Sequence, residues 1–163
     1  MAGHVLDLAT LLAILGDAGA GGAQVVLTNG VFDLLHVGHL RSLRRARREG
    51  DLLVVGINSD ASAAALKPGR PLVPAAERAE LVAALDPVDY VVVFDAPTAT
   101  ELIRAIRPAV YAKGADYSPD RLPEAAAVDE VGARLALLPL TAGRSTSALV
   151  RAVRAAADDS ADG

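Results

Sequence analysis

Short apolar runs alternate with segments of helical periodicity along most of the chain. Five of the runs are bounded by turn or charged residues, as buried strands are, and they cover residues 24–28, 52–58, 90–94, 109–112 and 134–138. Strands that alternate with helices pair in parallel, so the pattern predicts an α/β fold: a doubly wound, Rossmann-like sheet of five parallel strands with helices on both faces. In such a sheet, ligands bind beyond the carboxyl ends of the strands, where the strand order reverses.

The segments between the strands place apolar residues on one face of a helix. One helix follows the first strand, and another opens at Pro74, a favourable first-turn residue. The residues expected to share a face in these two helices are Leu40, Leu43 and Ala46, and Leu81, Ala84 and Leu85. Thr98 and Glu101 stand at capping-box spacing at the start of a third helix over residues 98–106, and a last helix is expected over residues 145–157.

We expect one domain over residues 1–157. Residues 1–22 are interpreted as an N-terminal helix and a Gly-rich linker, and residues 158–163 as a disordered acidic tail. The apolar stretch 5–15 is similar in composition to a signal peptide, but Asp7 interrupts it and no Lys or Arg precedes it, which favours a short amphipathic helix. No apolar run reaches the roughly 18 to 20 residues of a membrane helix. We therefore expect a cytoplasmic protein that does not bind a membrane.

Composition and charge narrow the classes of function. The net charge of −4 argues against a nucleic-acid-binding surface, which is normally basic. The chain has no Cys, so disulfides, thiolate metal sites and cysteine catalysis are excluded. A basic run at residues 41–48 lies toward the C-terminal end of its helix, where cations suit the helix dipole, and is interpreted as a solvated face.

Candidate chemistry lies where the first strand leads into a helix, in the segment TNGVFDLLHVGHL at residues 28–40. His36 and His39 are three residues apart at the N-terminal end of the helix, so they face the same way, about 4.5 Å apart along its axis. The free N–H groups at a helix start favour an anion, and Gly38 lets a phosphate approach the backbone. Donors already fixed around a phosphoryl group lower the barrier to its transfer without any covalent bond to the protein.

Two other interpretations of this segment were open. The histidines could bind a metal or merely cap the helix, and Asn29-Gly30 could form a hairpin turn. A metal site needs further ligands, of which only Asp33 is near, and no alternating strand follows Gly30. We therefore predict no metal held by the protein here.

Several motifs occur together in a fixed order. After HVGH at residues 36–39, they are NSD at 58–60, LK at 66–67 with RP at 70–71, ER at 77–78, KGADY at 113–117 and RSTS at 144–147. The set is similar to the HxGH cytidylyltransferase-like nucleotidyltransferases, and within them residues 24–153 resemble the D-glycero-β-D-manno-heptose 1-phosphate adenylyltransferases. The chain departs from the family at Ala115, where glycine is usual, and at Ser147, where threonine is usual. Ala115 would be strained if its position required a conformation open only to glycine.

The resemblance implies three groups of site residues. Those implied to act in catalysis are His36, His39 and Lys67. Those implied to bind the nucleotide and its phosphates are Thr28, Asn29, Gly30, Phe32, Asp33, Gly38, Arg78, Arg144, Ser145, Thr146 and Ser147. Those implied to bind the sugar phosphate are Asp60, Lys113 and Asp116.

Some of these residues have a plainer interpretation. The hydroxyl residues at 145–147 could only cap a helix, Lys67 could be a solvated lysine, and Arg78 could belong to a surface ion pair. Asp60 and Asp116 could simply form turns.

The function implied is transfer of AMP from ATP, with Mg²⁺, to heptose 1-phosphate, giving ADP-heptose and pyrophosphate. Relatives suggest a homodimer, and lipopolysaccharide is the usual destination of the heptose. One rival is a glycerol-3-phosphate cytidylyltransferase; those enzymes carry an Arg in a stretch like Arg-Thr-Glu-Gly, where this chain reads LTAG at residues 140–143, and they lack the counterpart of Lys113. The other rival is a nucleotide-binding module without turnover.

Overall fold

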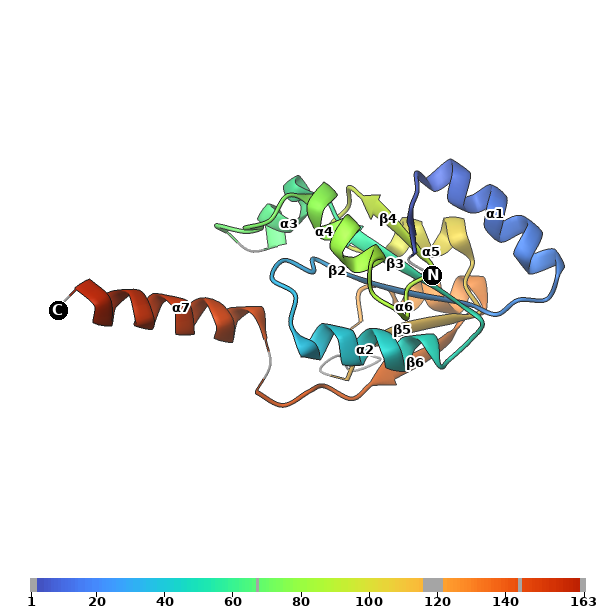
Figure 1. Cartoon of the computed structure of the whole chain (residues 1–163). Helices are drawn as coiled ribbons and strands as arrows, with labels where there is room; N and C mark the ends of the chain where they lie inside the picture. Colours follow the sequence, from blue (N-terminus) through green and yellow to red (C-terminus); the bar gives the residue numbers. More distant parts are fainter. Residues whose placement is uncertain (1–2, 67, 116–121, 144, 162–163) are drawn as a thin grey trace.

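The computed structural model describes residues 3–66, 68–115, 122–143 and 145–161, which form six strands and seven helices (Figure 1). The strands are β1 His4–Val5, β2 Val25–Gly30, β3 Leu52–Asn58, β4 Tyr90–Phe94, β5 Val110–Gly114 and β6 Arg134–Leu138. The helices are α1 Leu8–Ala20, α2 Val37–Arg47, α3 Asp60–Leu66, α4 Ala75–Ala83, α5 Thr100–Ile106, α6 Ala125–Val131 and α7 Thr146–Ala161.

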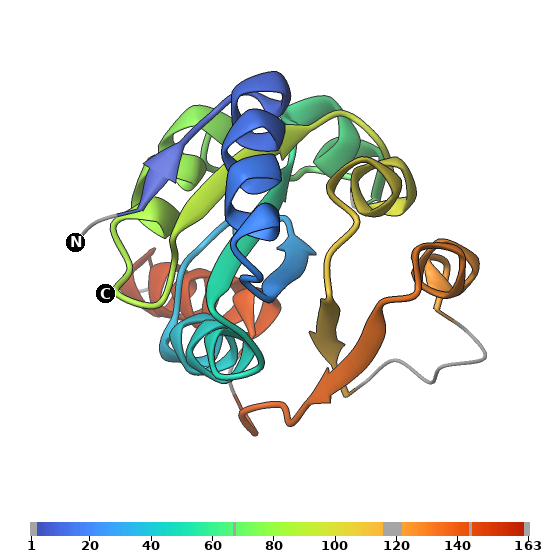
Figure 2. The same cartoon turned by 90° about the vertical axis from the view of Figure 1, so that its right-hand side faces the viewer.

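The strands form one sheet in the order β1-β4-β3-β2-β5-β6, and every neighbouring pair is parallel (Figure 2). The predicted doubly wound sheet is confirmed, with one strand more than the five expected. The additional strand, β1, has two residues, His4 and Val5, which pair with Tyr90 and Val91 of β4. A run of two residues has no periodicity, so the apolar pattern could not indicate it.

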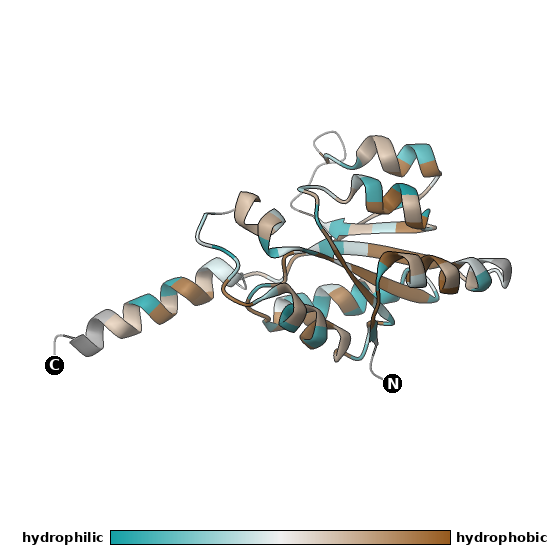
Figure 3. Ribbon diagram, turned by 90° about the horizontal axis from the view of Figure 1, so that it is seen from above, coloured by the Kyte–Doolittle hydropathy of each residue, from teal (hydrophilic) through white to brown (hydrophobic). Residues whose placement is uncertain are grey.

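Helices cover both faces of the sheet. Leu43 and Ala46 of α2 share a buried cluster with Val82 of α4 on one face. Leu11 of α1 and Ile103 of α5 belong to the cluster on the other face, together with residues of α6. Figure 3 shows the apolar strands between helices of mixed hydropathy. The core is built mainly from Val, Leu, Ile and Ala, in line with the 3% aromatic content.

The helices extend further than predicted at two segment boundaries. Helix α1 continues through Gly16 and Gly19 to Ala20, so the expected Gly-rich linker is largely helical; Asp7 caps this helix by accepting a hydrogen bond from the Thr10 N–H at 2.9 Å. At the other end of the chain, α7 runs to Ala161, so most of the tail predicted to be disordered is helical.

Helices α4 and α5 also differ from the prediction in detail. Leu81 is 50% exposed, because the buried side of α4 is formed by Arg78, Ala79, Val82 and Ala83. Helix α5 has no capping box: Ala99 is its N-cap, and the Ala99 N–H donates to the carboxylate of Glu124 at 3.2 Å. A cap supplied from 25 residues away cannot be predicted from local spacing.

The sheet order places the site. Strand β2 lies between β3 on one side and β5 on the other, so the chain leaves β2 in one direction and later returns on its opposite side. This reversal opens a crevice beyond the carboxyl end of β2, where ligands of such folds bind. None of the helices in the described part of the chain is long and apolar enough to cross a membrane.

Candidate active site

His36 and His39 lie together at the start of α2. His36 is the N-cap residue, and its ring stacks on that of His39 with 3.9 Å between centroids and 18° between planes. The backbone N–H of His36 donates to Nδ1 of His39 in a long hydrogen bond of 3.4 Å. The two imidazole rings therefore lie side by side at the helix start, as their spacing predicted.

The environment keeps His39 neutral. Burial, with a smaller contribution from the neighbouring His36, lowers the pKa of His39 from 6.5 to about 4. Because Nδ1 accepts the His36 N–H, the proton of the neutral ring belongs on Nε2, which is then a hydrogen-bond donor. Phe32 packs on the His39 ring at 5.2 Å between centroids, which helps to fix its orientation.

A cavity of about 480 Å³ lies at the crevice beyond β2. Six of the predicted site residues line it, namely Thr28, Asn29, Gly30, Phe32, His39 and Lys113. These residues come from β2 and the loop after it, from α2 and from β5, so the fold gathers them from segments far apart in the sequence.

A second cavity of about 380 Å³ adjoins the first, and both are lined by Phe32 and His39. Its lining also includes Thr146 and Ser147 at the start of α7, and Thr146 Oγ1 donates to the carbonyl of Leu34 at 3.4 Å. The N-terminal ends of α2 and α7 thus approach one another, as Figure 1 shows for the two helices. The resemblance implied that residues at both helix starts bind the nucleotide and its phosphates.

His36 faces a different hollow from that of its partner. It lines a cavity of about 280 Å³ together with Gly143, Ser145 and Ala148 of the segment around the start of α7. The two stacked rings therefore line different cavities: His39 lines the cavities of about 480 and 380 Å³, and His36 lines the one of about 280 Å³.

Asn29 is held in place by β5. Its side-chain Oδ1 accepts hydrogen bonds from the Tyr111 hydroxyl at 2.6 Å and from Lys113 Nζ at 2.8 Å. Tyr111 is fully buried, and sequence reasoning missed it because an apolar run was its only signal. Lys113 also forms an ion pair of 3.6 Å with Glu124, another residue of the cavity that the sequence did not single out.

Asp33 is an anchor for the loop before α4. It is 5% exposed and accepts hydrogen bonds from Arg70 at 2.6 Å and from the backbone N–H groups of Leu72 and Val73 at 2.7 and 3.0 Å. Burial alone would raise the pKa of Asp33, but these hydrogen bonds outweigh it and hold that pKa below its usual value of 3.8. With its oxygens engaged in this way, Asp33 orders residues around the second cavity, which Arg70 also lines.

The setting of Arg78 excludes one of the two interpretations given to it, the surface ion pair, because its side chain is fully buried. Nε donates to the Val73 carbonyl at 2.8 Å, Nη1 to the Val31 carbonyl at 2.5 Å and Nη2 to Asp60 at 2.7 Å. Each nitrogen of the guanidinium is thus bound to a protein acceptor, a geometry that does not favour the phosphate-binding role implied for Arg78. Asp60, whose side chain is 54% exposed, is its carboxylate partner.

The remaining predicted residues are placed as follows. Gly38 lies in the first turn of α2. Lys67, Arg144 and Asp116 lie outside the described residues. Ala115 does not have the positive φ that would strain an alanine. Among the described non-glycine residues, positive φ occurs at Phe32 and Arg107.

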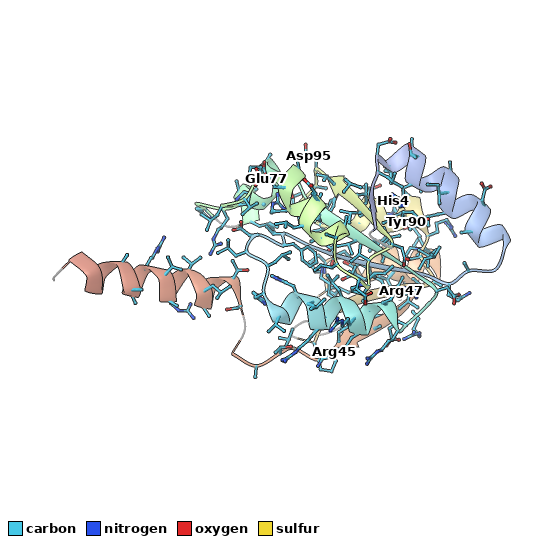
Figure 4. All side chains as sticks on the ribbon, in the orientation of Figure 1. His4, Arg45, Arg47, Glu77, Tyr90 and Asp95 are labelled. Carbon is cyan, nitrogen blue, oxygen red and sulfur yellow. The ribbon has the colours of Figure 1, made fainter. Side chains whose placement is uncertain are left out.

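The basic run on α2 makes protein contacts away from the histidines. Arg45 donates to the Pro139 carbonyl, and Arg47 pairs with Asp89 at 3.1 Å. Figure 4 labels both arginines on α2, and Arg47 lies near the end remote from α7. The residues that the structure describes contain no group of three or more His, Asp or Glu side chains suited to a metal ion.

This geometry agrees with the comparisons to known proteins. The cytidylyltransferase-like family model matches residues 27–146, which include the histidine pair, most of β2 and the whole of β3 to β6. The chain belongs to the cytidylyltransferase-like family. The predicted family is thereby confirmed.

Curated relatives agree over most of the chain. It is 46% identical to the bifunctional protein HldE of Geotalea uraniireducens over 92% of its length, and 51% identical to that of Syntrophotalea carbinolica over 81%. The chain spans only 31% and 27% of those two proteins.

Solved structures agree in fold. The lipopolysaccharide core biosynthesis protein of Thermoplasma volcanium matches with a TM-score of 0.61 and 25% identity, over 74% of this chain and 98% of that one. Pantothenate synthetase of Thermus thermophilus matches with a TM-score of 0.59 and 18% identity, over 87% of this chain and 63% of that one, which supports the fold alone.

Proposed function

We propose that the chain transfers AMP from ATP to the phosphate of D-glycero-β-D-manno-heptose 1-phosphate, giving ADP-heptose and pyrophosphate. The observation that carries the proposal is the neutral His39, which presents an Nε2–H donor to adjoining cavities at the strand-order reversal. Membership of the cytidylyltransferase-like family supports the reaction class, and the resemblance to heptose 1-phosphate adenylyltransferases supports the acceptor.

The reaction is an in-line displacement at the α-phosphorus of ATP. A phosphate oxygen of the acceptor forms a new bond to this phosphorus while the bond to the bridging oxygen of pyrophosphate breaks, and pyrophosphate leaves with the electron pair. The acceptor oxygen is already anionic, so no general base is needed. Catalysis then depends on positioning and on donors that stabilise charge on the phosphoryl oxygens.

The chain supplies such donors from two helix starts. His39 lines both cavities, and with Nδ1 engaged its Nε2–H is the donor that the ring can offer there. The N-terminal ends of α2 and α7 carry N–H groups and a positive dipole end. Thr146 and Ser147 add hydroxyl groups to the same cavity as His39. We place the triphosphate between these two helix starts, with the divalent cation, which we expect to be Mg²⁺, carried mainly by its phosphates.

The cellular setting is part of the proposal. ATP and heptose 1-phosphate are the partners, and we expect the reaction in the cytoplasm. The homodimer also remains a prediction, which light scattering of the purified chain would test.

The test is pyrophosphate release by the purified chain, with ATP or CTP presented to heptose 1-phosphate or glycerol 3-phosphate. We expect turnover with ATP and heptose 1-phosphate. Release only with CTP and glycerol 3-phosphate would overturn the acceptor and the base, and no release with any pair would indicate a binding module.

Substitutions of His39 test its role in turnover. His39→Asn lacks a donor at the Nε2 position, and loss of one charge-assisted hydrogen bond should lower kcat roughly 10- to 100-fold. His39→Gln can place an amide N–H near that position, so it should retain more activity. Arg41→Gln, an exposed change on the same helix, is the control. Unchanged kcat in His39→Asn would refute the role of this histidine.

A further inference from the structure

Glu124 is a buried carboxylate in the wall of the main cavity, and the mechanism above does not use it. It stands just before α6 and is 3% exposed. It lines the cavity together with Asn29, His39 and Lys113. Because α6 and α2 cover opposite faces of the sheet, Glu124 and His39 approach the cavity from opposite sides.

The two oxygens of this carboxylate have different surroundings. Oε1 accepts the Ala99 N–H at 3.2 Å and lies 3.6 Å from Lys113 Nζ. Oε2 is buried and has no hydrogen-bond partner among the described residues. Oε1 therefore has a structural role, because it caps α5. Oε2 has no such role.

A buried carboxylate oxygen without a donor is unfavourable, and such atoms are rare in folded proteins. Glu124 is nonetheless placed in a cavity wall rather than deep in the apolar core. When a ligand binds and donates a hydrogen bond to this oxygen, the cost of the unpaired oxygen disappears. The cavity therefore favours ligands that carry a donor at this point.

We propose that Glu124 Oε2 accepts a hydrogen bond from a sugar hydroxyl of a bound substrate. A phosphate is excluded by like charge, and a cation is disfavoured because Lys113 already offsets the carboxylate. A hydroxyl is a neutral donor, and both substrates carry several. This inference rests on the proposed function, and the hydroxyl belongs either to the ribose of ATP or to the acceptor sugar.

Glu124→Gln is the test variant. The amide keeps the size of the side chain and an oxygen to accept the Ala99 N–H, but it removes the charge and replaces the second acceptor with a donor. We expect KM and the calorimetric Kd to rise roughly 10- to 100-fold for one substrate, with kcat much less affected. Glu130→Gln, an exposed change on α6, is the matched control and should alter neither.

The substrates distinguish the two sources of the hydroxyl. If the ribose is the donor, 2′-deoxy-ATP or 3′-deoxy-ATP should bind the wild type as weakly as ATP binds Glu124→Gln, and the variant should lose nothing further with that analogue. If the acceptor sugar is the donor, only the constants for heptose 1-phosphate should change. Unchanged constants for both substrates in a folded Glu124→Gln would overturn the inference.

Two further measurements keep the result interpretable. If Glu124→Gln fails to fold, Glu124→Asp replaces it as the test variant, since it retains the charge but is one methylene shorter. KM and Kd should again rise for one substrate, and unchanged constants for both substrates would again overturn the inference. Absence of pyrophosphate from the wild type would refute the proposed function, whereas the calorimetric comparison of wild type and variant would still decide the role of Glu124.

Discussion

Replacing Arg78 by Met separates a structural role from a ligand-binding one. Methionine fills a similar volume but has no N–H donors. The substitution leaves the carbonyls of Val31 and Val73 without the bonds of 2.5 and 2.8 Å that they accept from Arg78. Arg78 is fully buried, so water does not readily replace those bonds.

The expected loss of stability follows from these contacts. A buried carbonyl left without a donor costs about 1 to 3 kcal/mol, and these two lie in part-buried contacts, so together they should lower the free energy of unfolding by up to about 6 kcal/mol. The ion pair with Asp60 is left out of this figure, because Arg78 is fully buried while its carboxylate partner is 54% exposed, so the pair is not a surface salt bridge. The total is a large part of the roughly 5 to 15 kcal/mol typical of a domain.

Urea denaturation followed by circular dichroism measures this loss, with Asp60→Asn as the comparison: it keeps an oxygen that can accept the Arg78 Nη2 hydrogen bond, so it should lower the unfolding free energy less than Arg78→Met does. Arg78→Lys should fall between the two, since it keeps one donor group. The reasoning would be refuted if Arg78→Met unfolded within about 1 kcal/mol of the wild type while its KM for ATP rose tenfold or more. That result would restore the phosphate-binding role implied by the resemblance.

Two further predictions concern pH and loop order. The pKa of His39 is about 4 in the folded protein and ordinarily 6.5, so between these values the unfolded chain binds more protons and the free energy of unfolding should rise with pH. The rise in the free energy of unfolding amounts to at most about 3 kcal/mol. Urea denaturation from pH 4 to 7 should show a smaller rise in His39→Asn than in the wild type. Asp33→Asn should lose about 1 to 3 kcal/mol at pH 7. The pKa of Asp33 lies below 3.8 in the folded protein, so the wild type should lose its stability advantage over Asp33→Asn as the pH falls through that folded pKa. Equal melting temperatures of wild type and Asp33→Asn at pH 7 would contradict this prediction.

The sheet was the most predictable part of the fold. Buried strands such as Leu52–Asn58 are continuous apolar runs, and their alternation with helices determines the parallel pairing. Features that depend on contacts between distant segments were not predictable. The cap of α5 comes from Glu124, and the buried side of α4 carries Arg78, a residue that any hydrophobicity pattern assigns to solvent.

The candidate site shows the same division. His36 and His39 were predictable as a pair because helical geometry alone places residues three apart on one face. Their separate surroundings were not, since these depend on where α7 approaches α2. Tyr111 and Glu124 gave no recognisable motif, although one holds Asn29 and the other lines the cavity.

Asp33 and Arg78 explain why a motif does not by itself identify a ligand contact. Both belong to motifs of nucleotide-transferring enzymes, yet their hydrogen bonds are made to the protein: Asp33 holds the backbone of Leu72 and Val73, and Arg78 binds the carbonyls of Val73 and Val31. Together they join the loop before α4 to the loop after β2, and Val31 lines both large cavities. A charged residue that positions such a loop is as necessary to the site as one that touches the phosphate. Burial with hydrogen bonds to the protein at each guanidinium nitrogen, as in Arg78, or at each carboxylate oxygen, as in Asp33, indicates the first role, and a polar atom that faces a cavity without a partner indicates the second.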